Sequence, residues 1–183
     1  MLYDADIRDD LCLFLEKKHE KVRFFDEFSM GFSRADLLMV TENDLTGIEI
    51  KSDADSYARL PKQIKYYDEY FDRNIIVVGS SHAIHVSEHV PEDWGIIVIN
   101  EEGDRIDSYE LRQPEQSGNS KLKQQLNLLW RRELSRIQEK NGLFKYTRKG
   151  RLFVENYVFS SLEAGRLKAD LIEELFEREY SFK

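Results

Sequence analysis

The chain has 183 residues, of which 41% are hydrophobic and 34% charged, with 9 Gly and 3 Pro. This composition excludes a largely disordered chain and predicts one packed domain, or a core of about 110 residues with an appendage. The single cysteine, Cys12, excludes an intramolecular disulfide framework and favours a reducing compartment. No apolar run approaches the roughly 18 residues of a membrane span, and the acidic N-terminal residues lack the basic region of a signal peptide. We therefore expect a cytoplasmic protein without a membrane partner.

The net charge of −8 hides an uneven distribution along the chain. Residues 121–151 contain ten Lys or Arg and two Glu, so this segment carries +8 and the rest of the chain −16. A basic segment of this kind is a candidate surface for a polyanion, because phosphate contacts supply most non-specific affinity for nucleic acids. The alternative is a helix face that neutralises the acidic body through internal salt bridges.

Hydrophobic periodicity gives the order of elements in the first part of the chain. Apolar residues at helical spacing predict a helix over 4–18 and another over 57–71, and β-prone runs predict strands over 22–28, 35–40, 46–51, 75–78 and 94–100. A turn around 42–44 joins the second and third strands into a hairpin. A short helix over 82–90 precedes the last of these strands, so the predicted order is α-β-β-β-α-β-α-β.

The second part of the chain is predicted to be helical. Residues 113–120 contain no apolar side chain and many turn formers, which is typical of a linker. Helical spacing then predicts three helices near 122–137, 152–162 and 167–176. The predicted organisation is a core over 1–112, a linker over 113–120 and a helical extension over 121–183 that packs on the core.

The most specific chemical pattern lies in the hairpin and the helix after it. Asp36 opens the second strand, and Glu49 and Lys51 close the third, two residues apart and therefore on the same face of the sheet. Two adjacent carboxylates repel each other unless a proton or a cation separates them, and Mg²⁺ or Mn²⁺ favours such oxygen ligands. Taken alone, Glu-x-Lys is also what any half-exposed strand can show. Gln63 and Tyr67, four residues apart, share one face of the following helix.

These residues, in the order Arg34-x-Asp36, Glu49-x-Lys51 and Gln63-x-x-x-Tyr67, resemble the PD-(D/E)XK nuclease superfamily in its RecB-type and phage lambda-type exonuclease branch. The resemblance covers roughly residues 1–112, with Arg-Ala-Asp in place of Pro-Asp, and is closest to a small, mostly uncharacterised bacterial family. It implies a restriction-endonuclease-like α/β fold, in which a mixed sheet with an α-β-β-β-α-β core is flanked by helices, and a nuclease that cuts DNA.

The resemblance also implies roles for single residues. Asp36 and Glu49 would bind Mg²⁺ or Mn²⁺, Lys51 would activate the attacking water, and Gln63 and Tyr67 would orient the lysine or the nucleic-acid backbone. An upstream acid, Glu27, would add a metal ligand, with Glu16 as the rival for that role.

The expected partner is a nucleic acid, with DNA as the expected substrate, and the sequence gives no indication of an oligomeric state. The side chains expected to contact phosphate are arginines and one lysine in both parts of the chain: Arg34, Arg59, Arg131, Arg132 and Lys149. The alternative function is a catalytically silent module on the same fold that binds nucleic acid or regulates another protein.

Overall fold

The computed structural model describes residues 4–53, 55–102 and 105–179. The chain divides into two compact units, Met1–Ser120 and Lys121–Lys183, which we call the first and second unit. Among the described residues, no helix combines the length and the apolar character needed to cross a membrane.

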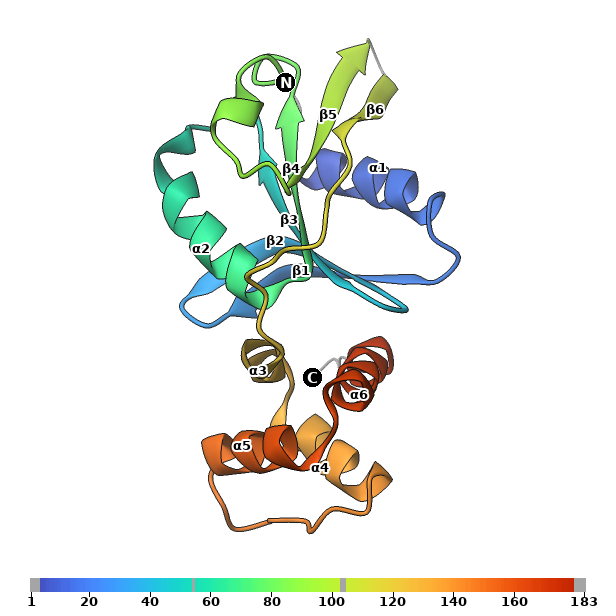
Figure 1. The fold of residues 1–183 in the computed structure, drawn as a ribbon. Helices are drawn as coiled ribbons and strands as arrows, with labels where there is room; N and C mark the ends of the chain where they lie inside the picture. The colour runs from blue at the N-terminus through green and yellow to red at the C-terminus, as the bar shows by residue number, and fades with distance from the viewer. Residues whose placement is uncertain (1–3, 54, 103–104, 180–183) are drawn as a thin grey trace. The chain divides into compact units, whose positions relative to one another are not determined.

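The first unit is a mixed α/β structure with one six-stranded sheet (Figure 1). Its elements are α1 (Asp4–Glu16), β1 (Val22–Met30), β2 (Ser33–Thr41), β3 (Leu45–Lys51), α2 (Leu60–Tyr70), β4 (Arg73–Gly79), β5 (Gly95–Glu102) and β6 (Arg105–Arg112). The strands lie in sequence order; β1, β2 and β3 are antiparallel, β3, β4 and β5 are parallel, and β6 returns antiparallel to β5. The predicted α/β fold class and its α-β-β-β-α-β core are confirmed.

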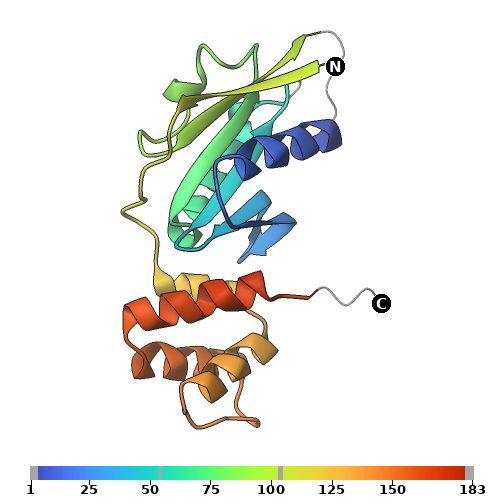
Figure 2. The same cartoon turned by 90° about the vertical axis from the view of Figure 1, so that its right-hand side faces the viewer.

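The two faces of the sheet carry different side chains. One face holds an apolar cluster in which Ile7, Leu11 and Leu15 of α1 contact residues of β2 to β5, among them Ile48 and Ile50. Alternation then turns Glu49 and Lys51 to the opposite face, as the sequence predicted. That face is covered by α2 (Figures 1 and 2), so Glu49 and Lys51 are 1% and 6% exposed rather than at the surface.

A glycine in β3 allows α2 to lie close to the sheet. A Cβ built on Gly47 would be 2.1 Å from Cδ2 of Phe71 and 2.7 Å from Cδ1 of Tyr67. Both rings are fully buried and contact each other, with centroids 5.5 Å apart. Because Gly47 has no side chain, the end of α2 can pack directly against β3 at this position.

Two local predictions for the first unit differ from the structure. Residues 82–90 form turns around a single 3-10 turn at Val86–Glu88 instead of a helix. The strand β6 was not predicted, because it lies at an edge of the sheet and its residues 107–112 are half-buried or exposed, without an apolar stripe. Residues 113–120 are held to the first unit by hydrogen bonds from Ser117 N to Asp72 O (2.7 Å) and from Arg73 Nη1 to Pro114 O (2.8 Å).

The second unit consists of helices α3 (Leu122–Gln125), α4 (Arg131–Lys140), α5 (Arg151–Ser161) and α6 (Ala164–Phe176). The single helix predicted over 122–137 is interrupted at Leu129 and Trp130, both of which have extended backbone. A buried ion pair joins the start of α4 to the residues after α6: Arg178 Nε and Nη2 donate to both carboxylate oxygens of Glu133, at 2.8 and 2.6 Å.

Candidate functional site

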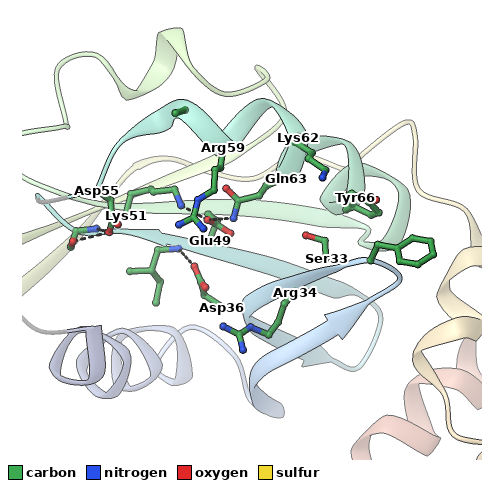
Figure 3. A pocket seen from close by; sticks show the side chains of 14 residues that line it. Ser33, Arg34, Asp36, Glu49, Lys51, Asp55, Arg59, Lys62, Gln63 and Tyr66 are labelled. Atoms are coloured by element: carbon green, nitrogen blue, oxygen red, sulfur yellow. Dashed lines mark hydrogen bonds and ion pairs between the residues drawn. The ribbon is translucent and has the colours of Figure 1, made fainter.

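A pocket of about 650 Å³ lies between the β1–β2 turn, the start of β2, the end of β3 and the N-terminal half of α2 (Figure 3). It brings together six of the residues singled out in the sequence: Arg34, Asp36, Glu49, Lys51, Arg59 and Gln63. The other residues that line it are Phe32, Ser33, Ile50, Ser52, Asp55, Ala58, Lys62 and Tyr66.

Glu49 is the centre of a buried polar network at the floor of this pocket. One carboxylate oxygen accepts from Lys51 Nζ and from Gln63 Nε2, the latter at 2.5 Å, and the other accepts from the Tyr67 hydroxyl at 2.8 Å. Burial, reinforced by the charge of Glu49, raises the pKa of Tyr67 well above its ordinary value, so this phenol stays a donor. Lys51 neutralises the charge of Glu49 within the network.

Asp36 lies beside this network at the point where β2 and β3 separate. The hydrogen-bonded register of the hairpin ends at Leu37 opposite Ile48, so Asp36 comes next to Glu49 where the regular ladder stops. Its Oδ2 accepts from the main-chain N–H of Ile50 at 2.8 Å and replaces the missing strand partner. Burial, and then the charge of Glu49, raise the pKa of Asp36 to about 6.

These residues do not form a multi-carboxylate metal cluster in the part of the chain that the structure describes, where no group of three or more His, Cys, Asp or Glu side chains comes together. Both oxygens of Glu49 already accept hydrogen bonds and Lys51 supplies its counter-charge, so this arrangement of Glu49 requires no cation. Binding of Mg²⁺ or Mn²⁺ stays a prediction.

Glu27 lies outside the pocket. It has a left-handed backbone with φ 48°, and its exposed carboxylate pairs with Arg34 at 3.0 Å. Glu16, the rival candidate, ends α1 and does not line the pocket either.

Of the remaining predicted contact residues, two arginines of the second unit are used inside that unit. Arg131 donates to the Tyr146 carbonyl and to Ser135 Oγ, and Arg132 lies over the ring of Trp130, 4.3 Å from its centroid. Lys149 is exposed, with Nζ 5.2 Å from the ring centroid of Phe153.

The sequence reasoning missed Lys62, Tyr66 and Phe32 as pocket residues. Lys62 is three positions after Arg59, and Tyr66 is four after Lys62, so helical spacing could have placed both on the pocket side of α2. Phe32 follows Gly31 in the two-residue turn between β1 and β2, and an aromatic side chain in such a turn was a signal available in the sequence.

The comparison with protein-family models matches residues 2–182, nearly the whole chain, to the family described as bacteriophage P4 protein cII. Neither the curated proteins nor the solved structures give a match. The prediction of a PD-(D/E)XK nuclease was wrong, because the matching family is a different one. In this structure Lys51, Gln63 and Tyr67 each donate to Glu49, so the residue types and spacing that suggested a nuclease also build an internal hydrogen-bond network. The chain belongs to the bacteriophage P4 protein cII family.

Proposed function

We propose that the chain is a phage-type regulatory protein that binds DNA without cutting it, and that the pocket of the first unit contacts the DNA backbone. The family match supports a regulatory role. The observation that carries the choice of partner is the group of four cationic side chains around one pocket: Arg34, Lys51, Arg59 and Lys62.

The carboxylates of the pocket oppose an anionic ligand less than their number suggests. Glu49 is neutralised by Lys51, and the raised pKa of Asp36 favours its protonated form more than in an ordinary aspartate. Asp55 accepts hydrogen bonds from the main-chain N–H and the hydroxyl of Ser52, at 2.9 and 2.7 Å. The carboxylates of Asp36, Glu49 and Asp55 therefore all interact with other groups of the protein.

Arg59 and Lys62 are the cations available to a ligand. Both are exposed, and neither makes a side-chain hydrogen bond or ion pair with another residue of the described ranges. Figure 3 shows the guanidinium of Arg59 directed toward the Lys51–Glu49 pair and Lys62 beside Tyr66. A phosphate at this opening forms one charge-assisted contact with each of these two side chains. The contacts displace water and break no hydrogen bond or ion pair between described residues.

Aromatic side chains at the rim extend the site beyond one phosphate. Phe32 is 99% exposed, and it is presented by a tight turn in which Gly31 has φ 60°. Tyr66 lines the same pocket from α2. Exposed rings next to cations are typical of surfaces that bind a nucleic-acid backbone and stack on an unpaired base or sugar.

The test measures the affinity of the full chain for labelled duplex and single-stranded DNA by fluorescence anisotropy, in EDTA and over a range of salt concentrations. We expect Arg59→Gln with Lys62→Gln to weaken binding by about tenfold and to reduce its salt dependence. Lys65→Gln is the matched control, because Lys65 is an exposed lysine of the same helix that does not line the pocket.

Two results contradict the proposal. Equal affinities of the double variant and the Lys65→Gln control would exclude the pocket as the DNA contact. Loss of intact DNA on addition of Mg²⁺ or Mn²⁺, abolished by Lys51→Ala, would contradict binding without cleavage.

A further inference from the structure

The second unit carries an exposed surface of aromatic and cationic side chains that the pocket of the first unit does not involve. It is formed by the segment between α4 and α5 and by the first turn of α5, and we call it the aromatic–cation surface: Phe144, Arg148, Lys149, Leu152 and Phe153. Phe144 is 67% exposed and Phe153 44%.

The segment that presents this surface has no regular secondary structure but is firmly held. The side-chain amide of Gln138, which is fully buried in α4, donates to the Phe144 carbonyl at 2.6 Å, and the main-chain carbonyl of Gln138 accepts from Leu143 N–H at 2.8 Å. Arg131 donates to the Tyr146 carbonyl, and the Tyr157 hydroxyl lies 3.3 Å from Phe144 N. The backbone that carries the exposed rings is therefore preorganised, which lowers the entropic cost of binding a ligand.

The rings form a cluster around the half-buried Tyr146. Its centroid is 4.7 Å from that of Phe144, 4.9 Å from Phe153 and 5.0 Å from Tyr157, all at steep angles between the ring planes. These contacts fix Phe144 and Phe153 in position while a large part of each ring stays accessible to solvent.

Four of the ten cationic side chains in residues 121–151 form ion pairs with carboxylates inside the second unit. Arg136 pairs with Glu174, Lys140 with Asp170, Lys145 with Glu139 and Arg151 with Glu155. Arg148 and Lys149 make no ion pair with a carboxylate of the described residues; both are exposed, and Lys149 Nζ lies 5.2 Å from the ring centroid of Phe153. The unit as a whole has fourteen Lys and Arg against nine Asp and Glu.

We propose that the aromatic–cation surface binds single-stranded nucleic acid, with unpaired bases stacked on Phe144 and Phe153 and phosphates contacting Arg148 and Lys149. Charge complementarity selects a polyanion. The protruding rings select unpaired bases, because bases inside a duplex do not offer their faces. This second contact is independent of the pocket in the first unit.

The test uses the full chain in the Arg59→Gln, Lys62→Gln background, so that failure of the pocket proposal does not affect it. Binding of a labelled 20-nucleotide oligothymidylate is compared with binding of a duplex of the same length and of a poly-glutamate peptide. We expect Phe144→Leu, and separately Arg148→Gln with Lys149→Gln, to weaken oligothymidylate binding by about tenfold, whereas Phe144→Trp retains it.

Lys145→Gln is the charge control, because this lysine lies in the same segment but is paired with Glu139; we expect it to bind within about twofold of the parent. Absence of oligothymidylate binding, or equal affinities for Phe144→Leu and Phe144→Trp, would overturn the proposal. Stronger binding of poly-glutamate, lost in the same variants, would also overturn it and would assign the surface to an acidic protein partner.

Discussion

Asp36 and Glu49 are neighbouring carboxylates on one face of the sheet, but their surroundings act on them in different ways. Glu49 accepts from three donors, one of which is the buried ammonium group of Lys51, whereas Asp36 has one main-chain donor. For Asp36, burial and the charge of Glu49 outweigh the stabilising N–H of Ile50, and the pKa rises from 3.8 to about 6. The folded protein therefore holds this proton more tightly than the unfolded chain does.

The sign of the resulting pH dependence follows from this difference. Stability contributed by Asp36 is fully present below pH 4, where both states are protonated, and is lost as the pH rises through 6. Asp36→Asn keeps an acceptor for Ile50 N–H without the charge. We expect it to raise the free energy of unfolding at pH 8 by about 1–3 kcal/mol, with no gain at pH 4. Urea denaturation at both pH values measures this, and an equal change at the two would contradict the assignment.

At the scale of elements, the position of α2 decides what the polar residues of β3 become. The helix covers the face that carries Glu49 and Lys51 and turns two surface charges into a buried pair. It lies close enough because Gly47 leaves room for Phe71 and Tyr67. Lys62 lies in the first turn of the same helix, and Arg59 immediately precedes it; both line the pocket.

Gly47→Ala tests this packing. A Cβ at 2.1 Å from a fully buried ring requires α2 to shift, so we expect a loss of about 2–4 kcal/mol in the free energy of unfolding. Gly150→Ala is the control, because nothing lies within 4 Å of a Cβ at that position and its φ is −62°. Similar urea midpoints for both variants would show that the contact is relieved without cost.

Local periodicity was sufficient for α1, the β2–β3 hairpin, β4 and β5, since each has an apolar stripe readable from a few residues. It could not reveal β6, whose residues at the edge of the sheet carry no such stripe, or the break before Trp130, which lies within an uninterrupted apolar pattern. In the site, alternation placed Glu49 and Lys51 on one face. Their burial depends on how α2 packs, and the hydrogen bond of Arg131 depends on a carbonyl 15 residues away in the sequence. Neither could be predicted from the spacing of residues.

At the scale of the whole molecule, the two units differ in charge. The first unit carries a net charge of −13 and the second +5. Residues 113–120, predicted to be a linker, are fixed to the first unit by Pro114 and Ser117. Pro114 also lies against Gly95, where a Cβ would be 2.8 Å from its Cδ. This segment therefore contributes to the first unit.

A truncation series measures that contribution. We expect a fragment ending at Ser120 to fold, and a fragment ending at Arg112 to be less stable by about 2–4 kcal/mol, since it loses several hydrogen bonds of about 1 kcal/mol each. Urea denaturation followed by circular dichroism compares the two fragments. Coincident transitions would mean that residues 113–120 only rest on the surface.

The left-handed backbone of Glu27 has a consequence for how the sheet ends. β1 is an edge strand, and such a strand offers unpaired N–H and C=O groups to the strands of neighbouring molecules. A residue with φ 48° in the middle of β1 breaks the regular alternation of these groups, and the charges of Asp26 and Glu27 lie at the same place. This edge is therefore a poor template for a further strand, which protects the protein against edge-to-edge aggregation at high concentration.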